Sequence, residues 1–114
     1  MTRSQISKFA SRAVILLFVI PAGGFADDAA KPGDHTVAQV CSVCHDAGLM
    51  GAPQIGDSSA WSRRLKTAGS VDGLVESATR GKGNMPARGG ESNLSEADLK
   101  AAVQYMLSKS GVGG

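Results

Sequence analysis

Both cysteines of the chain and one of its two histidines fall within five consecutive residues, Cys41-Ser42-Val43-Cys44-His45. Two thiols three residues apart on a helical turn can add to the two vinyl groups on one side of a porphyrin. The residue after them then projects its imidazole toward the iron. This C-x-x-C-H spacing is typical of covalent haem attachment. The motif predicts one covalently bound haem c on Cys41 and Cys44, with His45 as an axial ligand of the iron.

Three other uses of paired cysteines compete with this interpretation. A dithiol redox pair is expected beside a strand–helix–strand pattern, and the sequence shows no strand-like alternation. A zinc site needs about four nitrogen or sulfur ligands, and the other candidate, His35, falls in the same predicted helix. A plain structural disulfide is the third alternative. The motif favours haem, and the export signal at the N-terminus favours it further.

The N-terminus has the pattern of a secretory signal peptide. Three Lys or Arg residues precede the apolar run Ala13–Ile20, and the small or helix-breaking residues Pro21–Ala26 follow it, which is the usual order of regions in such a peptide. The eight-residue apolar run is too short to cross a bilayer, which takes about 20 residues. We therefore expect residues 1–26 to be cleaved after Ala26. Residues 27–114 would then form one periplasmic domain without a membrane span.

Removal of this peptide changes the composition of the chain. All three phenylalanines lie in residues 1–26, so Trp61 and Tyr105 are the aromatic residues of the remaining 88. A domain of that size buries a modest fraction of its surface, and we expect a haem to fill part of its interior. Cleavage removes three of the 12 Lys and Arg but none of the ten Asp and Glu, so the net charge changes from +2 to −1. This balance gives no support to nucleic-acid binding, which uses a basic patch.

The rest of the sequence predicts an all-α fold of about four helices and two long loops wrapped around the haem. Loops this long are uncommon in so small a domain, and wrapping a flat cofactor explains them. Asp57, Ser58 and Ser59 are all candidates for the N-terminal cap of the second helix. Apolar spacing and cap signals predict helices at Pro32–His45, Ala60–Thr67, Ser70–Gly81 and from Ser95 to a fraying end at Ser110–Gly114, with loops at residues 46–57 and 82–93.

Motifs along the whole exported domain match a known protein family. They are Gly33, Cys41–His45, Gly51-Ala52-Pro53, Gly56-Asp57, Trp61, Arg64, Gly81, Met85-Pro86, Gly89-Gly90 and Tyr105-Met106. Over about residues 33–109 the chain resembles the class I cytochromes c, and most closely the short bacterial cytochrome c-five subgroup. It departs from that subgroup after the Met-Pro step, where many members have a cysteine pair and this chain has Glu91-Ser92-Asn93-Leu94.

The resemblance implies that Met85 is the second axial ligand of the iron. A thioether is a soft ligand, and His/Met ligation raises the potential of a haem. Pro86 disfavours helix at the preceding residue and holds Met85 extended. Three residues compete: Met50 is expected on the histidine side, Met106 in the core and His35 in solvent. An incidental loop methionine is the plain alternative.

The resemblance also implies supporting roles. The Pro53 carbonyl can accept a hydrogen bond from the second imidazole nitrogen of His45, which would fix its tautomer. Trp61 and Arg64, one helical turn apart, are implied to hydrogen-bond the haem propionates. Core packing for Trp61 and a solvated charge for Arg64 stay open as alternatives. Gly33 is implied to permit close contact between the first and last helices.

If the protein fills both axial positions, the iron has no open position for a substrate. What remains is one-electron transfer, with iron cycling between Fe(III) and Fe(II). The sequence therefore favours a soluble periplasmic electron carrier rather than an enzyme, with a membrane cytochrome complex and a terminal oxidase or reductase as partners. Two alternatives stay open: a cytochrome subunit docked to a dehydrogenase, and a ligand-binding or peroxidatic haem protein if Met85 is labile.

Overall fold

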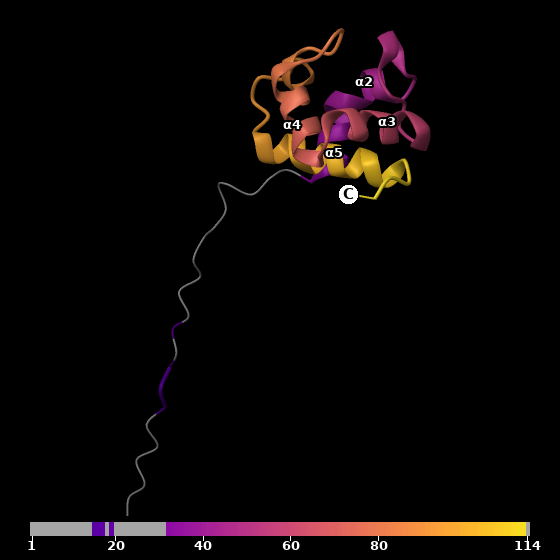
Figure 1. Ribbon diagram of the computed structural model, residues 1–114. Coiled ribbons are helices and arrows are strands. Elements are labelled where there is room, and N and C mark those ends of the chain that lie inside the picture. Colours follow the sequence, from indigo (N-terminus) through magenta and orange to yellow (C-terminus); the bar gives the residue numbers. More distant parts are fainter. Residues whose placement is uncertain (1–14, 18, 20–31, 114) are drawn as a thin grey trace, which may run out of the picture.

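The computed structural model describes residues 15–17, 19 and 32–113. The predicted cleavage after Ala26 and the new N-terminus at Asp27 lie outside the described residues. Residues 32–113 form a helical domain (Figure 1), and within them no strand occurs beyond an isolated bridge between Lys82 and Met85. The predicted all-α fold with four helices is confirmed. None of the described helices is long and apolar enough to cross a membrane.

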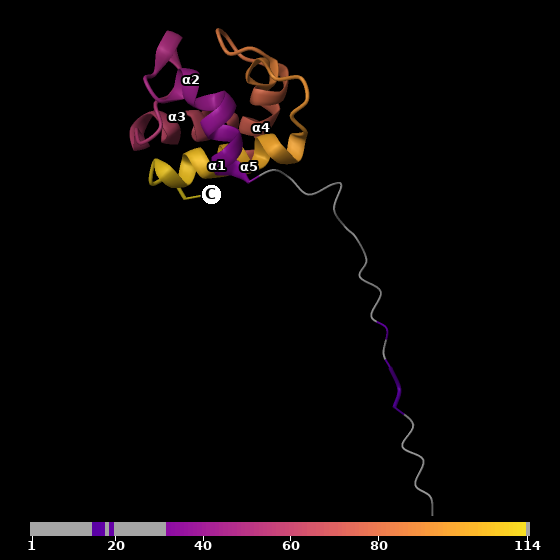
Figure 2. The same cartoon turned by 180° about the vertical axis from the view of Figure 1, so that it is seen from behind.

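Helix α5 (Glu96–Lys109) forms the base of the domain, and the first helix packs across it (Figure 2). The first helix is continuous and consists of α1 (Gly33–Thr36), a π turn (Val37–Cys41) and α2 (Ser42–His45). At the crossing, a Cβ on Gly33 would lie 2.2 Å from the carbonyl oxygen of Ala101. Glycine is required for this close approach of two backbones, as the resemblance implies.

Local cap signals set the start of the other helices. Helix α3 (Ser58–Ala68) begins after Asp57, whose Oδ1 accepts a hydrogen bond of 2.9 Å from an N–H of the first turn. Asp57 is therefore the cap among the three candidates. Helix α4 (Val71–Arg80) begins after Ser70, which caps it in the same way at 3.0 Å. Helix α5 begins at a capping box that starts with Ser95, and each such cap stabilises its helix by about 1 kcal/mol.

The apolar core surrounds one face of α5. This helix supplies five of the ten buried apolar side chains, and burial of each large one stabilises the fold by about 1.5–3 kcal/mol. The base of the domain therefore rests on side-chain packing around α5. The ten residues are Val37, Trp61, Val75, Ala78, Leu94, Leu99, Ala102, Val103, Met106 and Leu107.

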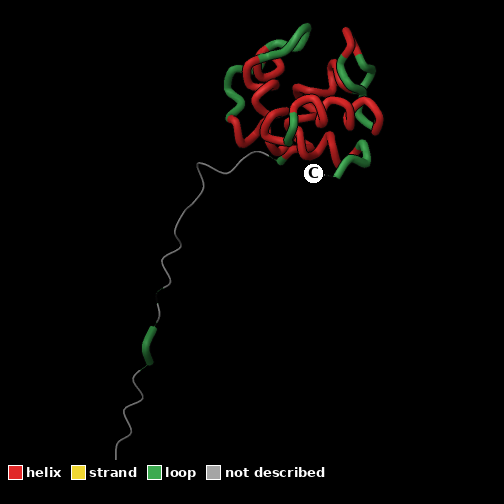
Figure 3. Tube along the Cα trace, in the orientation of Figure 1, coloured by secondary structure: helices red, strands yellow, loops and turns green. Residues whose placement is uncertain are grey.

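Two segments rise from this base as arms (Figures 1 and 3). The histidine arm, residues 46–57, contains a 3₁₀ turn at Leu49–Gly51. The methionine arm, residues 82–93, contains a 3₁₀ turn at Ala87–Gly90. The sequence predicts both segments as loops and does not predict the turns. Each turn includes a non-glycine residue with positive φ, Met50 at +54° and Arg88 at +55°, and such residues give no helical signal.

The C-terminal end of α5 differs from the prediction. Ser110 is expected to fray, but it is 4% exposed. Its hydroxyl donates to the Met106 carbonyl at 2.8 Å and accepts from the Gly56 N–H at 2.9 Å. The prediction of a frayed end is wrong at this residue, because Ser110 ties α5 to the histidine arm.

Candidate haem-binding site

A cavity of about 720 Å³ opens between the two arms. Val103 and Met106 of α5 border it, and Val40, Leu74 and Ala78 add to its apolar wall. Its volume lies in the range of roughly 300–1,000 Å³ that small-molecule sites occupy. All the residues that the sequence predicts for haem attachment, ligation or contact line this one cavity: Cys41, Cys44, His45, Pro53, Trp61, Arg64 and Met85. The residues present thus fit a covalently attached haem.

The two cysteines lie at the end of the first helix. Cys41 completes the π turn, Cys44 lies within α2, and both are half-buried free thiols. Burial raises the pKa of the Cys41 thiol. A π turn adds a residue to one helical turn and is frequent at functional sites. It rotates the residues after it, so that α1 packs on α5 while the motif lines the cavity.

His45 is held so that one ring nitrogen remains available. Its side chain is buried, and its Nδ1 donates to the Pro53 carbonyl at 2.8 Å. Because a carbonyl oxygen only accepts, Nδ1 carries the proton and Nε2 keeps a lone pair for a metal. The ring also stacks on Trp61, with 5.6 Å between centroids. The structure contains the His45–Pro53 hydrogen bond that the sequence predicts.

Side chains of α3 bind the backbone carbonyls of the histidine arm. Trp61 Nε1 donates to the Gln54 carbonyl at 3.0 Å, and Arg64 Nη2 donates to the Gly51 carbonyl at 3.1 Å. An indole has one N–H, and in this structure the Gln54 carbonyl accepts it. The propionate hydrogen bond implied for Trp61 stays a prediction. Arg64 keeps further donors for that role. Sequence reasoning missed the Gln54 and Gly51 contacts, because backbone acceptors leave no side-chain signal.

Met85 lines the cavity from the other arm. Its backbone pairs with Lys82 through two hydrogen bonds, of 3.0 Å from Lys82 N to Met85 O and 2.9 Å from Met85 N to Lys82 O. The half-buried side chain packs against the core. Pro86 follows in an extended conformation, with φ −68° and ψ 156°. The structure thus brings His45 and Met85, which are 40 positions apart, to one cavity.

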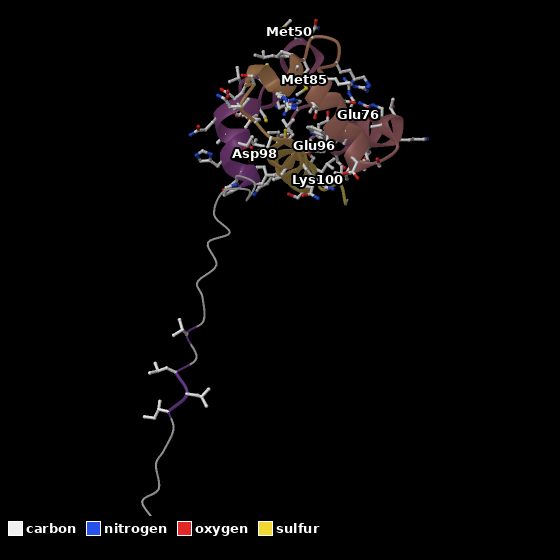
Figure 4. The ribbon with its side chains drawn as sticks, turned by 90° about the vertical axis from the view of Figure 1, so that its left-hand side faces the viewer. Met50, Glu76, Met85, Glu96, Asp98 and Lys100 are labelled. Carbon is white, nitrogen blue, oxygen red and sulfur yellow. The ribbon has the colours of Figure 1, made fainter. Side chains whose placement is uncertain are left out.

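Two of the competing residues, Met50 and Met106, also border the cavity, whereas His35 does not. Met50 is 70% exposed at the outer end of the histidine arm, and Met85 lies below it in Figure 4. Met106 is buried in the core at the edge of the cavity. His35 is exposed on α1 and does not line the cavity. Among the methionines of residues 32–113, Met85 is the one on the arm opposite His45.

The other interpretations of the cysteine pair find no support in the described part of the chain. Cys41 and Cys44 are not bridged. Across residues 15–17, 19 and 32–113 no group of three or more His, Cys, Asp or Glu side chains is placed to hold a metal ion. A zinc site therefore lacks its ligands among these residues.

Comparison with known proteins extends these observations. Residues 28–106 match the family described as cytochrome c oxidase, cbb3-type, subunit III. Cytochrome c5 of Azotobacter vinelandii is 42% identical over 77 residues, which cover 68% of this chain and 93% of the relative. Cytochrome c-555 of Chlorobaculum tepidum is 39% identical over 110 residues, which cover 92% of this chain and 99% of the relative.

A solved structure shows the same fold. The match is to a chain in the crystal structure of the electron transfer complex of nitrite reductase with cytochrome c. It has a TM-score of 0.64 and 38% identity, and the alignment covers 72% of this chain and 99% of that chain. The family and cofactor predicted from the motifs are confirmed. The chain belongs to the class I c-type cytochromes and binds haem c covalently.

Proposed function

We propose that this cytochrome is a soluble one-electron carrier of the periplasm, with His45 and Met85 as axial ligands. Its relatives are small cytochromes c, and electron transfer is the activity they support. One observation carries the ligand assignment: His45, at the end of α2, and Met85, on the methionine arm, line one cavity. The hydrogen bond from His45 Nδ1 to Pro53 supports it, because it leaves Nε2 free.

Each residue has a defined role in this proposal. When bound, haem c supplies an iron that exchanges single electrons between its two oxidation states. Cys41 and Cys44 hold the group through thioether bonds, which do not exchange. His45 donates the Nε2 lone pair, and Pro53 fixes the orientation of its ring. Met85 adds a soft thioether that favours the reduced metal and raises the potential. With both axial positions filled by side chains, none is left for a substrate.

We also propose export through a cleaved signal peptide. The described part of the apolar run, Ile15–Leu17 and Val19, is 74–83% exposed, which supports a segment that does not belong to the folded domain. The periplasmic protein should begin at Asp27 and carry the mass of one haem. Intact mass spectrometry checks this, and retention of residues 1–26 would contradict it.

Partner proteins are expected at the open side of the cavity. Three large apolar side chains that line it remain exposed, Val43 at 69%, Leu49 at 48% and Met50 at 70%, and clustered exposed apolar residues mark interaction sites. The solved relative belongs to a complex with nitrite reductase. This supports a terminal reductase as electron acceptor, alongside an oxidase or a membrane cytochrome complex.

The family match to an oxidase subunit favours a second candidate, a cytochrome subunit of a larger redox complex. The two candidates differ in how the native protein purifies. A carrier should elute as a free small protein from the periplasmic fraction, whereas a subunit should co-purify with its complex at fixed stoichiometry.

The ligand assignment is tested by replacing each methionine of the exported domain in turn. Met85→Ala should lower the midpoint potential by a sizeable part of the ~0.8 V that axial ligands span. The reduced variant should bind carbon monoxide readily, because an axial position opens. We expect wild type to bind carbon monoxide poorly, because both axial positions are filled. Met50→Leu and Met106→Leu should have the wild-type potential and should bind carbon monoxide equally poorly. Loss of ligation in either of these two variants, with Met85→Ala unchanged, would overturn the assignment.

A further inference from the structure

We infer that the hydrogen bond between Asn84 and Met50 is a clasp across the rim of the haem cavity, and that Asn84 is a positioning residue that keeps Met85 on the iron. The inference rests on the proposed ligation by Met85. Asn84 Nδ2 donates to the Met50 backbone carbonyl at 3.1 Å. Both residues are exposed and line the cavity, one from each arm. Within residues 32–113, this is the hydrogen bond that the structure records from one arm to the other.

The turn that carries Asn84 couples it directly to Met85. The reciprocal hydrogen bonds between Lys82 and Met85 close a two-residue turn of Gly83 and Asn84. Gly83 has φ +58°, and glycine is the residue that the first central position of such a turn favours when φ is positive. Asn84 precedes Met85 by one peptide bond, so a displacement of Asn84 moves the backbone of Met85.

The acceptor is also held in a specific conformation. Met50 has φ +54° and ψ 31°, a left-handed conformation that L-residues other than glycine adopt at an energetic cost. Such strain persists where the surrounding structure holds it, and it is concentrated at functional sites. The strained residue of the histidine arm is the one whose carbonyl receives the hydrogen bond from the methionine arm.

The clasp restrains the methionine arm by a hydrogen bond to the histidine arm. The histidine arm is bound to α3 through Gln54 and Gly51, whereas the backbone pair Lys82–Met85 lies within the methionine arm itself. Loss of the clasp should therefore favour departure of Met85 from the iron and leave His45 in place. A hydrogen bond of ordinary net strength corresponds to a change of roughly two- to tenfold in that equilibrium.

Imidazole binding to the ferric holoprotein tests this, because a neutral external ligand must displace Met85. Asn84→Ala should bind imidazole about two- to tenfold more tightly than wild type. Asn84→Asp has the same shape but no N–H donor, so its imidazole affinity should rise at least as much. Asn93→Ala is the matched control. Asn93 is an exposed asparagine of the same arm that does not line the cavity and has no recorded side-chain hydrogen bond. Its imidazole affinity should equal that of wild type.

The thermal midpoint and the far-red absorption band of methionine-bound ferric haem complete the test. We expect Asn84→Ala to unfold at a slightly lower temperature than Asn93→Ala, because it loses one native hydrogen bond. The band should titrate away at lower imidazole concentration only in the Asn84 variants. If the band is present in wild type but Asn84→Ala and Asn93→Ala bind imidazole equally, the clasp is wrong and Met85 ligation stands. If wild type lacks the band, both the proposed ligation by Met85 and the proposed clasp are wrong.

Discussion

The two arms around the haem cavity are held in different ways. In the histidine arm, the carbonyls of Gly51 and Pro53 accept hydrogen bonds from Arg64 and His45, which lie on separate helices. In the methionine arm, the Lys82–Met85 pair stays within the arm, and Arg88 Nη1 donates to the carbonyl of Leu94 just after it. These hydrogen bonds of the histidine arm thus come from neighbouring helices, whereas those of the methionine arm stay within it or end just after it.

This difference distinguishes the two proposed axial ligands. The ring of His45 is oriented by its hydrogen bond to Pro53 and by stacking on Trp61, so breaking one contact leaves the other. The backbone of Met85 is held by one tight turn and by the link from Asn84 to Met50, and its side chain packs against the core. If an external molecule enters the site, we expect it to replace Met85 and not His45.

Removal of the haem should have the largest effect, because both arms should lose their structure without it. Changing Cys41 and Cys44 together to Ala leaves the apolar walls of a cavity of about 720 Å³ exposed to water. We expect this variant to be largely unfolded, with both arms lost. Far-UV circular dichroism measures the helix content. A spectrum equal to that of the holoprotein would show that side-chain packing around α5 suffices for the fold.

A methyl group added at Gly81, the residue just before the methionine arm, should disturb that arm and not the histidine arm. A Cβ on Gly81 would lie 2.8 Å from the Ala87 nitrogen and 2.9 Å from the Met85 oxygen, at φ +80°. Gly81→Ala should lower the free energy of unfolding by roughly 2–4 kcal/mol and weaken the methionine band. Gly83→Ala is the control, since its φ of +58° gives strain without a contact within 4 Å. Chemical denaturation of Gly83→Ala should show a smaller loss in the free energy of unfolding, of about 1–2 kcal/mol.

A smaller effect is expected where the histidine arm meets α5. Ser110→Ala removes the hydroxyl that Gly56 N–H and the Met106 carbonyl use. Leaving the Gly56 donor without its partner should cost about 1–2 kcal/mol of unfolding free energy. Imidazole affinity should stay at the wild-type value, because Met85 is not involved. Ser108→Ala removes an exposed hydrogen bond of 2.8 Å from the Ser108 hydroxyl to the Tyr105 carbonyl. It should lower the free energy of unfolding less than Ser110→Ala does.

Much of the fold was open to prediction because its signals are local. The caps Asp57, Ser70 and Ser95 each bind an N–H three residues on. The sequence therefore identifies Ser70 and Ser95, and it limits the cap of α3 to Asp57, Ser58 or Ser59. The burial of Ser110 depends on Gly56, 54 positions away, and no local pattern contains that contact. The π turn is not visible in the apolar spacing either, because Val37, Val40 and Cys41 lie within it and are spaced as in an ordinary helix.

The site divides in the same way. Attachment and ligation depend on side-chain type, so Cys41, Cys44, His45 and Met85 can be picked out from motif and resemblance. The contacts that hold the arms end on backbone carbonyls, such as that of Met50. Any residue type supplies a carbonyl, so these contacts required the three-dimensional structure.

We propose above all that His45, from α2, and Met85, from the methionine arm, are both bound to the iron. The visible spectrum of the purified periplasmic protein in both oxidation states tests it most directly, since it reports covalent haem, spin state and methionine ligation together. We predict low-spin spectra in both states and the weak far-red methionine band in the ferric state. A high-spin ferric spectrum without that band, and prompt carbon monoxide binding by the reduced protein, would contradict the claim and favour a ligand-binding haem.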